Sequence, residues 1–515
     1  MSLLEVSLLD RLDPALASHI RRIEHFKQSL TLLTWDSRTG APSKGLVQGA
    51  RVRSTIKHEL FLLQRDPEFG RLLHALSEKT SEDPLVSRIA AYHLRSFQLA
   101  NSIPIKEFQA FANEQSQTSV VLAEAKKTSN FALVKPYLER VFDYHRKFSA
   151  YWGYQDHPYD AQIKQFDPDV DTATLDQVFS ELKSGLLPLI QRISRASKQP
   201  DRSIFAREFP YEQQRELATR LIQVIGYDFD AGKFGETLHP FSSAISPGDA
   251  RVATIYKRDV RVSALLALHE AGHSIYTQNI HPQLVDTGLG IFTSYGIHES
   301  QSIFWEKFIG RHRGFWEQNY GLAQSLFPEA FAGVKLDDFF FALNEVRPSL
   351  IRYEADDLTY NLHIIIRYEL EKALLEGSIS VDELPERWND KYEEYLGIRP
   401  ANDREGVLQD GHWISGFGHF ATYSLGFIFA GQLHGQLVKD KPDFDRLVAE
   451  GRNDVILDWL RSHVHQYGSS KSEYELLRDI TGGEIDTRPL LSYLTRKYED
   501  LYELQPSSQP AINGE

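Results

Sequence analysis

"ALLALHEAGHSIYTQNI", residues 264–280, joins an apolar helical run to three groups that are costly to bury. Its first five residues are alanine and leucine, which is typical of a helix inside a protein. His269, Glu270 and His273 follow within five residues, and an imidazole or carboxylate without a partner is expensive in an interior. The stretch therefore predicts a buried helix whose polar residues face a common ligand.

These polar residues have the spacing H-E-x-x-H. Histidines four residues apart lie on one face of an α-helix, so His269 and His273 can bind a single zinc ion. Glu270 points to the side, where it can act as the general base towards a metal-activated water. Two purely structural histidines would need partners that the apolar neighbours do not offer. Gly272 in mid-helix also indicates that something approaches the backbone closely.

A catalytic zinc site needs a third protein ligand and keeps a fourth position open. The extended form H-E-x-x-H-x-x-G-x-x-H is absent, because Tyr276 and Asn279 occupy its glycine and histidine positions. "SYGIHESQSIFWEKFIG" (294–310) instead supplies Glu299 in a second stretch of helical period. Glu299 could alternatively be a first-turn acid that the helix dipole stabilises. We predict that it is the third ligand.

Composition narrows the function classes. The 515 residues are 42% hydrophobic and 25% charged, as in ordinary globular proteins, and the formal net charge of -14 argues against nucleic acid as a partner. Cysteine is absent, so any metal must be held by His, Asp or Glu. The N-terminus lacks the pattern of a secretory signal, and no apolar run of about 18 residues suggests a membrane span. We therefore expect a cytoplasmic protein.

Most of the chain has helical period, and no linker or repeat divides it. We predict one domain over residues 1–515, mainly α-helical, with two lobes around a long cleft and a frayed tail at 505–515. Gly377 and Gly468 stand where helix C-caps are expected. The clearest predicted helices are 85–101, 175–194, 211–226, 357–377 and 454–468.

One segment, 232–259, alternates and is rich in β-branched and aromatic residues. It predicts a β-hairpin with its turn at Pro247-Gly248, hence a small β-sheet beside the H-E-x-x-H helix.

Several motifs together resemble the carboxypeptidase Taq family of thermostable zinc metallocarboxypeptidases. The similarity runs from about residue 35 to the last helices, and the combination is more specific than any single motif. The matching stretches are "WDSRTGAP" (35–42), "DARVAT" (249–254), "HEAGH" (269–273), "HESQS" (298–302), "IRYEAD" (351–356) and "GVLQDGHW" (406–413).

The resemblance implies a helical homodimer that carries Zn²⁺ or Co²⁺ and releases single amino acids from peptides with a free C-terminus. It suggests His239 and Tyr423 as donors to the reaction's oxyanion. It suggests Arg352 for the substrate carboxylate, which a guanidinium binds bidentately. The alternatives are a histidine after a strand, a buried tyrosine, and a helical ion pair of Arg352 with Asp356.

The surroundings of the metal are less determined by the sequence. Metal-bound histidines commonly donate their second N–H to a carboxylate or carbonyl, and Asp249, Asp356 and Asp410 are the candidates. His298 could contact substrate or cap its helix.

His412 and Trp413 could line the cleft or only pack. The chain departs from the family pattern at Ala253, His419 and Ala421, which concerns specificity more than reaction type.

Three other functions fit part of the pattern. An oligopeptide endopeptidase could share the zinc core, and the position of Arg352 would distinguish it. A zinc-stabilised scaffold would have no use for Glu270 and would close the site with four ligands. "GFGHFA" (416–421) fits a nucleotide-binding glycine motif, but the required strand–turn–helix context is missing.

Overall fold

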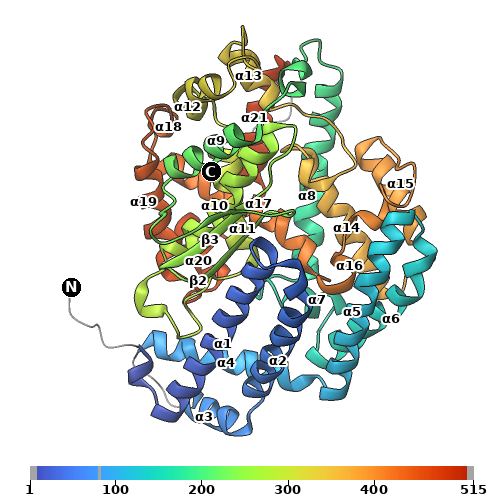
Figure 1. Cartoon of the computed structure of the whole chain (residues 1–515), viewed down its shortest axis with the longest axis vertical. Helices are drawn as coiled ribbons and strands as arrows, with labels where there is room; N and C mark the ends of the chain where they lie inside the picture. The colour runs from blue at the N-terminus through green and yellow to red at the C-terminus, as the bar shows by residue number, and fades with distance from the viewer. Residues whose placement is uncertain (1–7, 79–82, 507–515) are drawn as a thin grey trace.

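The computed structural model describes residues 8–78 and 83–506, and it confirms a mainly α-helical fold (Figure 1). The first ten helices are α1 Pro14–Thr39, α2 Leu46–Gln64, α3 Pro67–Ser77, α4 Pro84–Ser102, α5 Ile105–Thr128, α6 Phe131–Trp152, α7 Pro158–Ile163, α8 Thr172–Ser194, α9 Tyr211–Val224 and α10 Val260–Gln278.

Eleven further helices follow α10 in the described part of the chain. They are α11 Tyr295–Ile303, α12 Arg313–Leu326, α13 Leu336–Leu343, α14 Thr359–Glu376, α15 Leu384–Leu396, α16 His412–Ser415, α17 His419–Asp440, α18 Phe444–Ala449, α19 Asn453–His463, α20 Glu473–Thr481 and α21 Arg488–Tyr502.

Four of the five clearest predicted helices agree with α4, α8, α9 and α14. Gly377 ends α14 in the left-handed conformation with φ of 79°, as its position predicts. The prediction for 454–468 is wrong at its C-terminal end, because α19 ends at His463 and a 3₁₀ turn follows it. The segment expected to fray, 505–515, lies mostly outside the described residues.

A three-stranded sheet lies beside α10, as predicted. Its strands are β1 Phe234–Glu236, β2 Phe241–Ser246 and β3 Asp249–Thr254, in the order β1-β3-β2. β2 and β3 form the predicted antiparallel hairpin around the turn at Pro247-Gly248, and β1 adds a parallel strand. Trp35 of α1 packs on Phe241 with ring centroids 5.3 Å apart, so the N-terminal helix reaches the sheet next to α10.

Two glycines allow the central helices to approach closely, and Figure 1 places α10, α11 and α17 together in the middle of the molecule. A Cβ atom on Gly272 of α10 would lie 2.6 Å from the backbone oxygen of Gln301 in α11. A Cβ atom on Gly426 of α17 would lie 2.5 Å from Cβ of Glu299. Only a residue without a side chain fits at either position.

Buried apolar side chains from Leu8 to Tyr502 form one contiguous cluster around these helices. Within the described ranges, no helix has both the length and the apolar character needed to cross a bilayer. The division into two lobes stays a prediction.

Candidate metal centre and cleft

The side chains of His269, His273 and Glu299 converge between α10 and α11. Oε2 of Glu299 lies 3.4 Å from Nε2 of His273 and 3.8 Å from Nε2 of His269. One ligand atom from each residue lies within 4.8 Å of the other two. Two ligands of a tetrahedral zinc at about 2.0–2.2 Å stand roughly 3.3 Å apart, so the spacing fits a single ion.

The hydrogen bonds around this trio favour a cation at its centre. Nδ1 of His269 lies 2.9 Å from Oε2 of Glu306, and Nδ1 of His273 lies 3.2 Å from the backbone oxygen of His298. Each Nδ1 therefore donates to its acceptor, and Nε2 is the ring atom that faces Glu299. Oε1 of Glu299 is buried without a hydrogen-bond donor among the described residues. Two imidazole nitrogens and a carboxylate that converge in this way are a suitable ligand set for a divalent metal.

Charges next to the trio set its protonation. Burial disfavours a charged His269, but Glu299 and Glu306 outweigh it and raise the pKa of His269 to about 9. Burial raises the pKa of Glu270, and the imidazoles of His269 and His273 partly offset this. A carboxyl with a raised pKa can accept a proton and release it again near neutral pH.

Glu306 contacts the trio through His269, and the sequence motifs do not single it out. It lies on a π-helical turn, Phe304–Ile309, that continues α11. Its other oxygen, Oε1, binds Nζ of Lys307 at 2.8 Å. Burial opposes ionisation, but Lys307 and His269 lower the pKa of Glu306 to about 2, so it stays ionised. A signal was present, because Glu306 follows Glu299 by seven residues and so falls on the same helical face.

A buried ion network extends from Glu306 to the last helix. Nζ of Lys307 lies 3.4 Å from Oδ1 of Asp357, which also lies 3.2 Å from Nε of Arg311. Lys497 of α21 binds the other oxygen of Asp357 at 3.0 Å. Because each charge has an opposite partner, the network can hold Glu306 rigidly in the interior.

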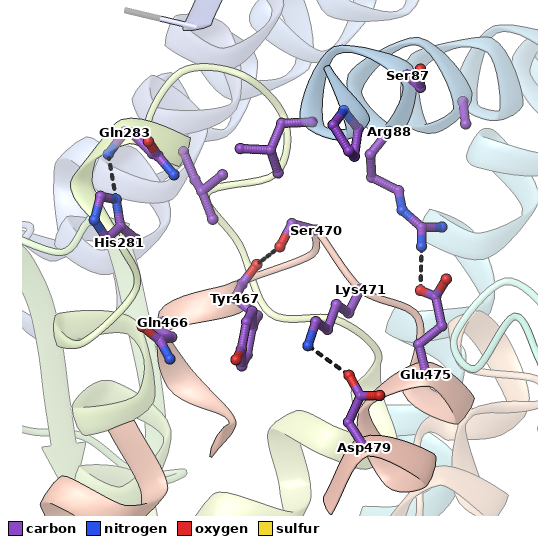
Figure 2. Close-up of a pocket in the computed structure, with 14 residues that line it drawn as sticks. Ser87, Arg88, His281, Gln283, Gln466, Tyr467, Ser470, Lys471, Glu475 and Asp479 are labelled. Carbon is purple, nitrogen blue, oxygen red and sulfur yellow. Dashed lines mark hydrogen bonds and ion pairs between the residues drawn. The ribbon is translucent and has the colours of Figure 1, made fainter. Parts of the chain in front are cut away.

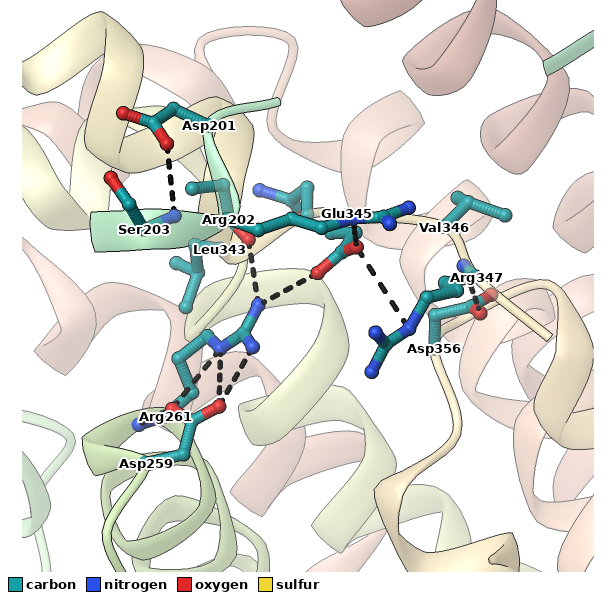
Figure 3. A network of polar contacts seen from close by, with 12 residues as sticks. Asp201, Arg202, Ser203, Asp259, Arg261, Leu343, Glu345, Val346, Arg347 and Asp356 are labelled. Atoms are coloured by element: carbon teal, nitrogen blue, oxygen red, sulfur yellow. Dashed lines mark hydrogen bonds and ion pairs between the residues drawn. The ribbon is translucent and has the colours of Figure 1, made fainter. Parts of the chain in front are cut away.

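Figure 3 shows a second network that fixes the start of α10. Asp259 caps the helix by accepting the backbone N–H of Arg261 at 2.9 Å. The guanidinium of Arg261 also binds the Asp259 carboxylate and the backbone oxygen of Ala342. Glu345 links Arg261 to Arg202. The first turn of α10 is thereby held, which fixes where its histidines point.

A cleft of about 1020 Å³ opens onto the trio. His269, Glu270 and Glu299 line it together with the other residues that the sequence suggests, which are His239, Arg352 and Tyr423. His239 lies in the exposed loop between β1 and β2, at the rim. The sequence candidates thus lie around one cavity, although they come from five separate segments of the chain.

Arg352 and Tyr423 contact each other in this cleft. The guanidinium carbon of Arg352 lies 4.8 Å from the Tyr423 ring centroid, a cation–π contact. Nη2 of Arg352 lies 3.7 Å from Oδ1 of Asp410, and its Nε has no hydrogen-bond partner among the described residues. The Tyr423 hydroxyl lies 3.3 Å from Nε2 of His412.

A family model described as carboxypeptidase Taq (M32) metallopeptidase matches residues 15–498. The chain belongs to this family. It is 42% identical over 490 residues to Carboxypeptidase 1 of Bacillus subtilis (strain 168), covering 94% of this chain and 97% of that one. It is 38% identical to Thermostable carboxypeptidase 1 of Thermus thermophilus, covering 92% and 95%.

A solved structure has the same fold. The M32 carboxypeptidase from Deinococcus radiodurans R1 superposes with a TM-score of 0.92 at 33% identity, covering 94% of this chain and 98% of that one. The protein is therefore a metal-dependent carboxypeptidase, which confirms the function predicted from the sequence.

Two alternatives that the sequence left open for the carboxylates of this carboxypeptidase are not found in the structure. The helical pair between Arg352 and Asp356 does not form, because Arg352 lies on a 3₁₀ turn and pairs with Asp410. Asp356 instead accepts backbone N–H groups of Arg347, Leu358 and Thr359 at the start of α14.

None of the three aspartates proposed to hold the metal-site histidines contacts them in the described structure. Instead, Glu306 accepts the Nδ1 proton of His269, and the backbone oxygen of His298 accepts that of His273. Asp249 binds Arg251, and Asp410 binds Arg367 at 2.6 Å.

Aromatic rings form one wall of the carboxypeptidase cleft. His298 stacks on Phe292 with centroids 4.0 Å apart, and Ser294, not His298, caps α11. His419 lies 5.2 Å from Tyr295 and 4.9 Å from Tyr423. Burial lowers the pKa of His419 to about 3, so its ring is neutral.

Trp413 and His412 have different surroundings. Trp413 is fully buried and donates to the backbone oxygen of Val407, so it packs in the interior, whereas His412 lines the cleft.

A second cavity, of about 800 Å³, lies between α4 and α20 and carries none of the candidate residues. Figure 2 shows its charged side chains bound to one another, Arg88 to Glu475 and Lys471 to Asp479. The ammonium of Lys471 also lies 3.8 Å from the Tyr467 ring centroid. With these charges paired, the cavity offers little to the chemistry of the carboxypeptidase.

Proposed function

We propose that His269, His273 and Glu299 hold zinc, with cobalt as a substitute, and that the enzyme releases the C-terminal residue of peptides. The observation that carries this proposal is the position of Arg352 in the same cleft as the metal trio. A cationic residue at that place can select substrates that end in a free carboxylate. The substrate's last residue would lie between the trio and Arg352.

The metal, when bound, polarises the scissile carbonyl and makes a water at the site more acidic. Glu270 accepts the proton of the attacking water and delivers it to the leaving amine. Its burial next to two imidazoles supports this role, because its raised pKa brings the neutral and ionised forms closer in energy. The acceptors that bind the Nδ1 protons of His273 and His269 orient the two rings, so that Nε2 of each is the atom that can bind the metal.

Arg352 lines the cleft, where its guanidinium can bind the terminal carboxylate. Its Nε lacks a partner among the described residues, and Asp410 and Tyr423 hold the guanidinium from two sides. Burial lowers the pKa of Arg352, but the negative charge of Asp410 outweighs burial and raises this pKa above its usual value. The guanidinium is therefore always cationic. Arg367 forms the closer pair with Asp410, which leaves Arg352 free to bind substrate.

Tyr423 is the stronger candidate for stabilising the oxyanion. Burial raises its pKa to about 12, so the hydroxyl keeps its proton and can donate it. His412 lies within 3.3 Å of the hydroxyl and orients it. His239 is at the exposed rim, from where it would have to move inward when substrate binds.

The test uses matched peptides that end in a free carboxylate or a C-terminal amide, with metal content measured by elemental analysis. We expect release of single amino acids from the free-carboxylate peptide, about one zinc per chain, and loss of turnover when the metal is chelated. Equal cleavage of both peptides would contradict the role of Arg352 and favour an oligopeptide endopeptidase.

Two further proposals rest on the family resemblance and the sequence. We propose a homodimer and a cytoplasmic location, with the chain as one domain whose two lobes flank the cleft. Sedimentation of the purified enzyme tests the first, and fractionation of its native cells tests the second. A chain that sediments as a monomer at micromolar concentration would contradict the homodimer.

A further inference from the structure

Two carboxyl groups meet in the interior next to the start of α11. Asp167 follows α7, and Glu473 is the first residue of α20. Their exposed fractions are 0% and 1%. Burying two adjacent carboxylates without a cation is strongly unfavourable, so the contact needs an explanation.

The outer oxygen of each carboxyl group receives a backbone N–H. Oδ1 of Asp167 accepts the N–H of Gly296 at 2.7 Å, and Oε1 of Glu473 accepts the N–H of Asp169 at 2.9 Å. The inner oxygens, Oδ2 of Asp167 and Oε2 of Glu473, are buried and have no well-formed hydrogen bond, although the hydroxyl of Ser294 interacts with both carboxyl groups. Only a proton on one of them can turn their contact into a hydrogen bond.

The charged and titratable neighbours do not neutralise the pair. Asp169 adds negative charge beside Asp167, and Tyr295 and Tyr474 are uncharged at neutral pH. Arg95 interacts with Asp169 and Glu473 only over a distance, because its guanidinium binds the backbone oxygen of Lys164.

Burial raises the pKa values of both carboxyl groups, that of Asp167 to about 6. The pKa of Glu473 rises further because Asp167 lies beside it.

We propose that Asp167 and Glu473 share one proton and act as positioning residues, which fix the first turn of α11 and thereby the metal ligand Glu299. Gly296, which Asp167 binds, lies one helical turn before Glu299. The backbone N–H of Tyr295 also donates to the oxygen of Phe166 at 3.1 Å. Segment 166–169 is thus attached to α11 at one end and, through Glu473, to α20 at the other.

The pair predicts that stability falls as pH rises. Because the folded-state pKa is above the unfolded value of about 4, the stabilisation is complete below pH 4 and is lost as pH rises through the folded pKa. Loss of the shared proton leaves two carboxylates facing each other, and α11 loses its anchor. The inference rests on the proposed role of Glu299 as a metal ligand. The free energy of unfolding, however, can be measured whether or not Glu299 binds the metal.

The test compares the wild type with Glu473→Gln, whose amide can donate to Asp167 at every pH while its oxygen still accepts the N–H of Asp169. Unfolding is followed by denaturant titration of the zinc-loaded enzyme between pH 5 and pH 9. We expect the unfolding equilibrium constant of the wild type to rise relative to the variant by up to about tenfold per pH unit. Asp167→Asn should behave like Glu473→Gln, and the exposed control Glu484→Gln should follow the wild type.

Zinc affinity is measured in parallel by competition with a chelator. We expect the dissociation constant of the wild type to rise relative to Glu473→Gln over the same pH range, since the ligands are identical in both. Parallel stability profiles of the two proteins would overturn the shared proton. If the stabilities of the wild type and Glu473→Gln diverge with pH while their zinc affinities change in parallel, the pair does not position Glu299. Zinc binding that survives Glu299→Gln unchanged would instead contradict the proposed metal site.

Discussion

Oε2 of Glu306 lies 2.9 Å from Nδ1 of His269, on the side of the imidazole that faces away from Glu299. The same carboxylate is bound to Lys307, and Lys307 to Asp357. The orientation of a metal-binding ring therefore depends on charges that extend through the interior to α21.

Glu306→Gln should weaken zinc binding by about 10- to 100-fold, the usual effect of losing a carboxylate that orients a metal-bound histidine. The amide can still accept a hydrogen bond, but it no longer makes the imidazole more basic. Chelator competition measures the affinity. Glu317→Gln, on the exposed face of α12, is the control, and equal affinities for the two variants would show that Glu306 does not support metal binding.

Glu270→Gln should bind zinc as tightly as the wild type and lose activity by about 10²- to 10⁴-fold in kcat, because the side chain no longer accepts a proton. Elemental analysis and single-turnover kinetics on the same preparation check both parts. Turnover within threefold of the wild type would exclude Glu270 as the general base.

Arg352→Lys should lower kcat/KM for peptides with a free carboxylate by about 10- to 100-fold, since losing a charge-assisted hydrogen bond costs about 1.5–3 kcal/mol. The corresponding peptide amides should be affected much less. Steady-state kinetics on both substrates, for wild type and variant, give the comparison. An equal loss on both would mean that Arg352 supports the fold and does not bind the carboxylate.

Gly272→Ala should destabilise the protein and weaken metal binding, because its Cβ would lie 2.6 Å from the backbone oxygen of Gln301 and push α11 away. Gly321→Ala in α12 is the matched control. Its Cβ would meet nothing within 4 Å, so it should stabilise the protein by about 1 kcal/mol through helix propensity. Thermal unfolding of the two variants should shift in opposite directions.

Glu371 provides a test of pH dependence away from the metal. It is fully buried, and its Oε2 accepts hydrogen bonds from the Tyr159 hydroxyl and the backbone N–H of Gly418. Burial raises its pKa to about 8. The carboxyl is therefore protonated in the folded protein at neutral pH, and its contribution to stability is lost as pH rises from about 4.5 to 8.

Glu371→Gln keeps a neutral side chain of the same shape at every pH. Its free energy of unfolding should increase relative to the wild type over that pH range, by at most about 1.4 kcal/mol per pH unit. Denaturant titration at three pH values is enough to measure the trend. A constant difference between the two proteins would mean that Glu371 is ionised in the native state.

The sequence predicts the helices and the convergence of His269, His273 and Glu299 well because both depend on local spacing. H-E-x-x-H positions its histidines through the period of one helix, and the ligand chemistry of zinc then restricts the third residue to a few acids. The hairpin before α10 follows from its turn residues and alternation. No local sequence pattern predicts the aromatic wall around His298 and His419, because its rings come from separate segments that meet only in the tertiary fold.

The sequence does not predict the partners of Arg352 and Asp356, because these depend on the local backbone conformation. An i,i+4 spacing implies contact only if the backbone is helical, and Arg352 lies on a 3₁₀ turn before an extended residue. Asp356 therefore falls where it can cap α14, and Arg352 reaches Asp410 from a distant segment. Glu306 was missed because an acid next to a lysine on a helix is typical of a solvated face, whereas here both are buried.

Gly426 follows Tyr423 by three residues on α17, and its backbone lies directly on the side chain of Glu299. One helix thus presents a hydroxyl that lines the cleft and also packs against the side chain of a proposed metal ligand. Engineering of substrate preference through α17 should therefore alter metal retention as well, and a library built there needs to be screened at a fixed, buffered zinc concentration.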